Sequence, residues 1–126
     1  MNKSDIKLLF VYNTNTGIFN SVVDVAHKIF SPQTYPCQLC RITHNNFKIK
    51  TLWKDFIDSN TFETIYIHKD EAPFLNLLHI KFPIIMYQER NSRLKTLIDS
   101  QSINQINSVS ELITLITKEL KMINLV

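Results

Sequence analysis

A nearly continuous apolar run, Ile6 to Tyr12, constrains the fold of this chain more than any other stretch. It is rich in strand formers, and such a run predicts a strand that is buried on both faces, parallel to a neighbour and central in its sheet. The run is too short for a signal-peptide core or a membrane span. We therefore expect no membrane partner and, without an export signal, a cytoplasmic location.

The size and charge of the chain set the next limits. Its 126 residues fit a single domain, residues 1–126, and 44% hydrophobic and 20% charged residues are ordinary values for a globular protein. The net charge of +3 is weak, and the lysines and arginines are interleaved with acidic residues. Because no basic stripe of the kind that binds nucleic acids stands out, we expect no nucleic-acid partner.

Helical and strand periodicities follow one another along the rest of the chain. After the polar turn Asn13 to Gly17, which holds the only glycine, apolar residues recur with helical spacing from Ile18 to Phe30, and Ser31-Pro32 ends that helix. Ser108 to Glu111 is a capping box that opens a last helix. Between them, the pattern predicts a helix over Phe47 to Asp58, a strand over Thr61 to His68, a short helix-like piece over Phe74 to His79, and strands over Phe82 to Tyr87 and Arg93 to Ile98.

The order of these elements predicts how the strands assemble. Right-handed crossovers make the first two strands parallel neighbours, and the last two, joined by the turn Glu89 to Ser92, form an antiparallel hairpin. The expected fold class is α/β, with a mixed four-stranded sheet, helices on both faces, and a C-terminal hairpin and helix. An alternative is a flavodoxin-like sheet in which Gln38 to Thr43 adds a strand, although Pro36 and the shortness of the run make a poor central strand.

Pro83 opens a strand after a short helical piece, and from Thr64 onward the chain resembles thioredoxin-like proteins. The resemblance implies a thioredoxin-like fold and a cis Phe82–Pro83 bond. In thioredoxins the Cys-x-x-Cys motif directly follows the first central strand, whereas here Cys37 and Cys40, the only cysteines, come one helix later. If the helix over 18–30 runs down the sheet, the two cysteines lie at the edge away from Pro83.

Several short motifs are spread along the chain: Tyr12-Asn13, Gly17, Asp24, His27-Lys28, Tyr35-Pro36-Cys37-x-Leu39-Cys40, Thr43-His44 and His68-Lys69-Asp70-Glu71. Together they resemble the pattern of a family of small bacterial proteins, and the likeness covers most of the chain. The resemblance implies no activity.

The cysteine pair suggests redox chemistry if it lies on a helix, where residues three apart share a face. Thr34 as a cap and Pro36 in the first turn predict such a helix, which would place Cys37, Cys40 and His44 on one stripe. Cys37, nearest the helix start, would then be the nucleophile of a thiol–disulfide oxidoreductase, and Cys40 the resolving thiol. His44 or His27 would carry the proton, the partner would be a small-molecule or protein thiol, and no cofactor is expected.

Two other interpretations of the same residues remain open. Cys37, Cys40, His44 and His27 are a possible tetrahedral zinc set, which would make the chain a non-enzymatic binding module. A lone Cys-x-x-Cys is only a moderate metal signal, and the gap from His27 to Cys37 is not a recognised ligand spacing. In the third interpretation the cysteines are small buried hydrophobic residues with a packing role.

A second candidate site lies where the two parallel strands end, since ligands of open α/β sheets bind at the carboxyl edge. The turn after the first strand would meet the polar end of the second strand there, and its amides could hold an anion with help from Lys69. Asp70 and Glu71 argue against a crowded phosphate site, and no P-loop motif occurs. The candidate ligand-binding residues are Asn13, Thr16, Gly17, His68, Lys69, Asp70 and Pro83.

Overall fold

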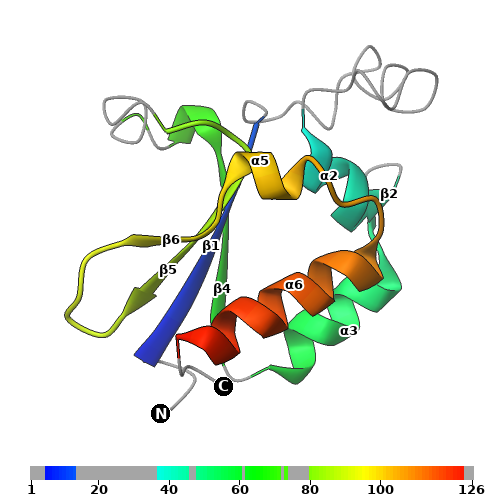
Figure 1. The fold of residues 1–126 in the computed structure, drawn as a ribbon. Coiled ribbons are helices and arrows are strands. Elements are labelled where there is room, and N and C mark those ends of the chain that lie inside the picture. The colour runs from blue at the N-terminus through cyan, green and yellow to red at the C-terminus, as the bar shows by residue number, and fades with distance from the viewer. Residues whose placement is uncertain are drawn as a thin grey trace.

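The computed structural model describes residues 5–13, 37–45, 48–60, 62–71, 73 and 80–123. Figure 1 shows their arrangement, and within them no helix has the length and apolar character needed to cross a membrane. The elements are β1 (Ile6–Tyr12), α2 (Gln38–Thr43), β2 (His44–Asn45), β3 (Lys48–Ile49), α3 (Thr51–Ser59), β4 (Glu63–His68), the 3-10 turn η4 (Lys69–Glu71), β5 (Ile84–Glu89), β6 (Lys95–Ile98), α5 (Ser100–Ile103) and α6 (Val109–Met122).

The main sheet has four strands in the order β4-β1-β5-β6. β1 runs parallel to β4, with Tyr12 opposite His68, and antiparallel to β5, with Val11 opposite Ile84. β6 returns antiparallel to β5. The predicted mixed four-stranded sheet, with its parallel pair and its C-terminal hairpin, is confirmed.

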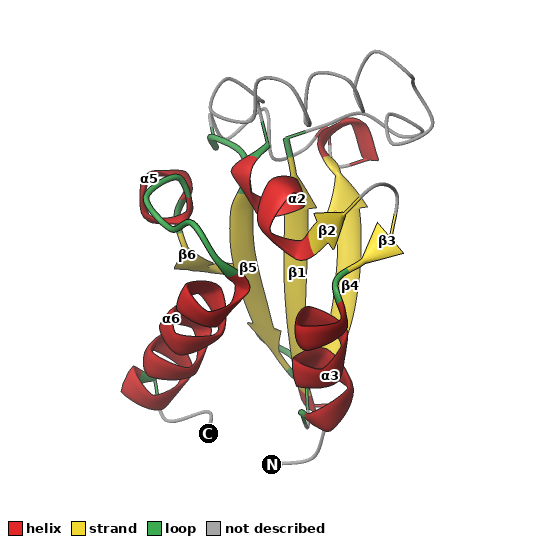
Figure 2. Ribbon diagram, turned by 90° about the vertical axis from the view of Figure 1, so that its right-hand side faces the viewer, coloured by secondary structure: helices red, strands yellow, loops and turns green. Residues whose placement is uncertain are grey.

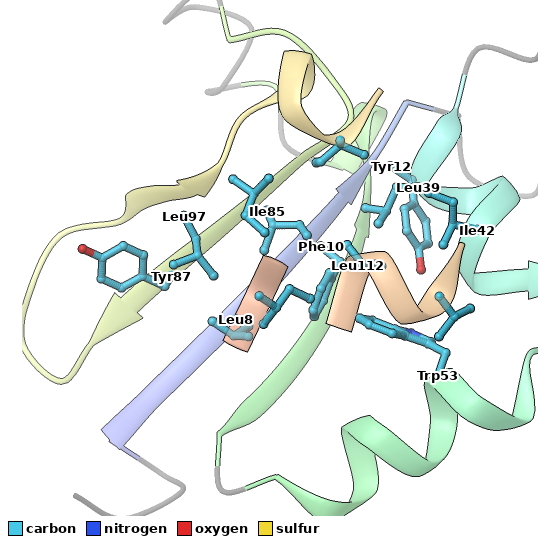
Figure 3. Close-up of a cluster of buried hydrophobic side chains, with 14 of the residues drawn as sticks. Leu8, Phe10, Tyr12, Leu39, Ile42, Trp53, Ile85, Tyr87, Leu97 and Leu112 are labelled. Carbon is cyan, nitrogen blue, oxygen red and sulfur yellow. The ribbon is translucent and has the colours of Figure 1, made fainter. Parts of the chain in front are cut away.

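Both faces of β1 are buried, as its apolar run predicts. Its even-numbered side chains join one large core, in which Trp53 lies edge-on to the Phe10 ring with a centroid separation of 5.3 Å. Leu9 and Val11 belong to a second cluster on the opposite face. A fully buried apolar side chain contributes about 1.5–3 kcal/mol, so these two clusters make β1 the centre of the fold. Figure 3 shows the first core, whose labelled members are Leu8, Phe10, Tyr12, Leu39, Ile42, Trp53, Ile85, Tyr87, Leu97 and Leu112.

Helices α2, α3 and α6 cover the face of the sheet that carries Leu8, Phe10 and Tyr12, and Figure 2 shows them in front of the strands. α6 begins as the capping box predicts, because the Ser108 hydroxyl accepts the Glu111 backbone N–H at 3.2 Å. The helix predicted over residues 18–30 and the short piece over residues 74–79 lie outside the described residues. The coarse prediction of a sheet flanked by helices is therefore confirmed for the described part of the chain.

The chain between the cysteines and β4 differs from the prediction in two ways. Gln38–Thr43 is helical, so the flavodoxin-like alternative, in which this stretch adds a strand, is wrong. The helix predicted from Phe47 begins only at Thr51, because Lys48–Ile49 is extended and pairs antiparallel with His44–Asn45. Local periodicity favours helix here, but the pairing with His44–Asn45, a few residues earlier, decides the backbone conformation.

The hairpin and the segment before it agree with the prediction. The Phe82–Pro83 peptide bond is cis, as the resemblance to thioredoxin-like proteins implies. The turn between β5 and β6 places Asn91 at a φ of 62°, a left-handed conformation that asparagine tolerates better than most residues. Asp99 caps α5 through a bond of 2.9 Å from the Ser102 N–H, and the Ser100 hydroxyl donates to the Phe82 carbonyl at 3.2 Å.

Candidate functional site

Cys37 and Cys40 are joined in a disulfide, with their Cα atoms 5.3 Å apart. Cys37 is not inside the helix but caps it, with extended backbone at φ −120° and ψ 92°. The predicted helix start, with Thr34 as the cap, is therefore wrong. The Cys37 sulfur accepts the Cys40 backbone N–H at 3.2 Å and so performs the capping role that was assigned to the Thr34 hydroxyl.

A second backbone amide also points at the Cys37 sulfur. The N–H of Asn13, the residue directly after β1, donates to it at 3.3 Å. Cys37 therefore accepts two backbone N–H groups from two separate parts of the chain, while both cysteine side chains are fully buried. Hydrogen bonds of this kind favour the ionised form of a thiol.

The disulfide lies at the carboxyl edge of β1, where Figures 1 and 2 both show α2. Pro83 lies at the same edge, because it precedes Ile84, which pairs with Val11 near the end of β1. The expectation that the cysteines lie at the opposite edge from Pro83 is wrong. The contact between Cys37 and Asn13 spans 24 residues, and helix direction alone does not reveal it.

The same edge brings the two predicted candidate sites together through Tyr12. The Tyr12 ring meets His44 in a T-shaped arrangement at 5.8 Å between centroids, and it meets His68 in the same way at 5.9 Å. His44 belongs to the predicted redox set, whereas His68 belongs to the predicted ligand-binding set. Asn13, next to Tyr12, belongs to the predicted ligand-binding set, and its backbone N–H donates to the sulfur of Cys37, which belongs to the predicted redox set. The described members of both sets thus gather around the end of β1.

Thr43, which was not among the predicted site residues, is the hydrogen-bonding centre of this group. Its hydroxyl is fully buried and donates to the Leu39 carbonyl at 2.9 Å. It also lies 2.8 Å from His44 Nδ1 and 3.5 Å from the Tyr12 hydroxyl oxygen. Burial raises the pKa of Tyr12 far above its ordinary value, and the bond to Thr43 only partly opposes that shift. In the sequence, the signals that could have pointed to Tyr12 and Thr43 are the motif pairs Tyr12-Asn13 and Thr43-His44.

His44 does not share a helical stripe with the cysteines, so that prediction is wrong. α2 ends at Thr43, and His44 is extended at φ −126° and ψ 152° because it pairs with Ile49. Its backbone N–H still caps α2 by donating to the Cys40 carbonyl. Within the described ranges, no three or more His, Cys, Asp or Glu side chains form a group that could hold a metal ion. His27, the fourth member of the predicted zinc set, lies outside those ranges.

The predicted ligand-binding residues are only partly covered. His68 ends β4, and its Nδ1 lies 3.2 Å from Glu71 Oε1, which also accepts the His68 backbone N–H at 2.9 Å. Lys69 and Asp70 lie on the 3-10 turn that follows. Thr16 and Gly17 lie outside the described residues. The one described amide of the predicted anion-binding turn, that of Asn13, donates to a sulfur atom.

Gln38, between the two cysteines, ties α2 to the C-terminal part of the chain. Its Nε2 donates to the Ile106 carbonyl, and its Oε1 accepts the Arg41 Nε–H at 2.8 Å. The first bond spans 68 residues and links α2 to the segment that precedes α6. The disulfide is therefore held between the end of β1 on one side and the start of the C-terminal helix on the other.

Comparisons of the chain with protein-family models, with curated proteins and with solved structures find no significant match. The resemblances to thioredoxin-like proteins and to the bacterial family therefore stay predictions.

Proposed function

We propose that this protein has a thioredoxin-like fold and carries out thiol–disulfide exchange, with Cys37 as the attacking thiolate and Cys40 as the resolving thiol. The observation that carries the proposal is the pair of backbone N–H groups, from Asn13 and Cys40, on the Cys37 sulfur. The parallel β1–β4 pair, the antiparallel hairpin and the cis bond before Pro83 support the fold assignment.

The two amides favour the ionised form of Cys37. A hydrogen bond to a charged acceptor is worth about 1.5–3 kcal/mol, and here there are two. Full burial acts in the opposite direction, because it disfavours a charged sulfur. Two aligned donors outweigh that cost in our proposal, so the pKa of the reduced Cys37 thiol lies below its ordinary range. A thiolate at neutral pH is the species that attacks a disulfide.

The exchange proceeds in two balanced steps. The Cys37 thiolate attacks one sulfur of the partner's disulfide, forms a mixed disulfide and releases one partner thiolate. The Cys40 thiolate then attacks the Cys37 sulfur, forms the internal disulfide and releases the second partner thiolate. The protein dithiol loses two electrons, and the partner disulfide gains them. The Cα separation of 5.3 Å lies in the range that allows the internal bond.

Burial of both sulfurs limits which partners react quickly. Cys37 and Cys40 are each 0% exposed in the oxidised protein, so attack by an outside thiol requires exposure of a sulfur. We expect small thiols to exchange faster than bulky ones for that reason. Comparing the rates of reduction by a small monothiol and by a reduced protein dithiol measures this difference.

Equilibration with mixtures of reduced and oxidised glutathione tests the proposal. We expect a single two-electron transition between dithiol and internal disulfide, followed by mass spectrometry after acid quenching and alkylation. Two matched variants separate the roles of the thiols. Cys40→Ser should accumulate a glutathione mixed disulfide at Cys37. Cys37→Ser should form one at Cys40 about threefold more slowly if the two pKa values differ by about one unit, because the thiolate fraction falls about tenfold while the nucleophilicity of the thiolate rises by about threefold. Absence of an internal disulfide across the whole range of mixtures would refute the proposal.

A further inference from the structure

The side chain of Gln38 fixes the start of α2 to the segment that precedes α6, and Figure 1 shows that segment passing beside α2. The Ile106 carbonyl can only accept and the Arg41 Nε–H can only donate, so these two partners set the orientation of the Gln38 amide. Ile106 is itself held, because its backbone N–H donates to the Ile103 carbonyl at 3.2 Å. The start of α2 is therefore tied to a fixed point 68 residues away.

The body and the far end of α2 are held in place by other contacts. With six residues, α2 is too short to be stable without tertiary contacts. Leu39 and Ile42 anchor it in the core, and the Thr43 carbonyl at its far end accepts the Lys50 N–H at 2.9 Å. Helix ends fray before helix interiors do. Local opening of α2 therefore begins at its start, where it can expose Cys37 while Leu39 stays in the core.

We propose that the bond from Gln38 to the Ile106 carbonyl is a latch, which keeps Cys37 buried while it is made and gives an outside thiol access to the Cys37 sulfur when it breaks. Cys37 caps α2 and lies at the end that opens, whereas Cys40 lies inside the helix. Both cysteines are fully buried in the closed protein. The latch therefore selects Cys37 as the sulfur that outside thiols reach. Its role in thiol exchange rests on the function proposed above.

Opening of the latch lets an outside monothiol reduce the disulfide in two steps. The monothiol, as its thiolate, attacks the Cys37 sulfur, the bond to Cys40 breaks, and Cys40 leaves as a thiolate that takes a proton from water. A second monothiol then attacks the outside sulfur of the mixed disulfide and releases Cys37. The protein disulfide gains two electrons, and the two monothiols lose them as they join in a disulfide. Opening of α2 controls the first step.

Hydrogen exchange of single backbone amides, followed by NMR, tests the latch without any thiol reaction. The amides of Asn13 and Cys40 both donate to the Cys37 sulfur, so they exchange with solvent when Cys37 moves away. Gln38→Met removes the bond to the Ile106 carbonyl at similar side-chain length and helix propensity. We expect this variant to exchange both amides about fivefold faster or more, the factor that corresponds to a lost hydrogen bond worth about 1 kcal/mol.

Two control variants separate local opening of α2 from other effects. Gln105→Met makes the same substitution at an exposed residue beside Ile106, and we expect it to leave exchange of both amides unchanged. Ile116→Val removes a methyl group from the core and lowers global stability by a comparable amount, and we also expect no change at the two amides. Unchanged exchange in Gln38→Met, or equal acceleration by Gln38→Met and Ile116→Val, would overturn the latch.

Reduction by 2-mercaptoethanol tests the consequence for chemistry. We expect the disulfide of Gln38→Met to be reduced about fivefold faster than that of the native protein or of Gln105→Met, with the mixed disulfide at Cys37 after acid quenching. Equal rates, or a mixed disulfide mainly at Cys40, would overturn access through the latch. If the native protein forms no internal disulfide in glutathione mixtures, the proposed function fails, and amide exchange alone decides whether Gln38 holds the start of α2. Circular dichroism of each variant confirms that it is folded.

Discussion

Replacing Thr43 by valine is the most informative change for the structure of the candidate site. The substitution keeps the shape of the side chain but removes a fully buried hydroxyl with three neighbours: the Leu39 carbonyl, His44 Nδ1 and the Tyr12 hydroxyl. Each hydrogen bond is worth about 0.5–1.5 kcal/mol net, and the long contact to Tyr12 belongs at the low end. We therefore expect Thr43→Val to lower the free energy of unfolding by about 2 kcal/mol.

Thr43→Ser is the matched control, because it keeps the hydroxyl and loses one methyl group. That loss costs about 0.8 kcal/mol, so we expect the serine variant to be more stable than the valine variant by about 1 kcal/mol. Urea denaturation followed by the fluorescence of Trp53, the single tryptophan and a fully buried one, measures both values. A valine variant as stable as the serine variant would show that the hydroxyl contributes nothing and would refute the reasoning.

A double-mutant cycle sharpens the same prediction. Tyr12→Phe removes the partner hydroxyl, so in the Thr43→Val background it should cost less than in the native protein. The two changes together replace both members of one hydrogen bond by apolar groups. This lowers the free energy of unfolding less than leaving one buried hydroxyl without its partner does. An interaction energy of zero between the two substitutions would mean that the 3.5 Å contact between the two hydroxyl oxygens contributes nothing to stability.

Three further outcomes follow from burial and linkage. Because the pKa of Tyr12 is raised in the folded protein, the Tyr12 hydroxyl ionises first in the unfolded chain. Its contribution to the free energy of unfolding is therefore complete below about pH 10 and is lost as pH rises above that value, by up to about 1.4 kcal/mol per pH unit. In urea denaturation between about pH 9 and 11, we expect the free energy of unfolding to fall less steeply with pH for Tyr12→Phe than for the native protein. Trp53→Ala should cost about 3–5 kcal/mol by circular dichroism, whereas Leu52→Ala, at a side chain 53% exposed, should stay within about 0.5 kcal/mol. Reducing the disulfide should lower stability by about 2 kcal/mol or less, because the loop it closes is short, and reductant should not affect the stability of Cys37→Ser.

The strands could be predicted from the sequence because their signals are local. The apolar run of β1 requires burial on both faces, and the lengths of chain between the strands decide which neighbours are parallel. The hairpin follows from a polar turn between two apolar runs, and the α6 start follows from the side chains of Ser108 and Glu111. The cis bond at Pro83 came from the resemblance to thioredoxin-like proteins, because the residues themselves carry only the low base rate of an X-Pro bond.

The arrangement of the candidate site depends on contacts between distant residues, which periodicity does not reveal. Cysteine is not among the common helix caps, so Thr34 was the natural prediction and Cys37 was missed. The helix ends at Thr43 because His44 pairs with Ile49, a contact set by the following segment. The approach of Cys37 to Asn13 likewise depends on how the chain returns to the end of β1. Composition and spacing therefore singled out the cysteine pair, but not the groups that surround it.

Titration of the Cys37 thiol in the reduced protein tests the central claim most directly. The Cys40→Ser variant isolates this thiol, and its thiolate is followed by ultraviolet absorbance as pH is raised, with the Cys37→Ser variant as the matched control. Because the Asn13 and Cys40 backbone amides both donate to the sulfur, and the serine at position 40 keeps its amide, we expect Cys37 to have a pKa below the ordinary thiol value of about 8.5. A midpoint at or above that value would contradict the claim that Cys37 is the activated thiol.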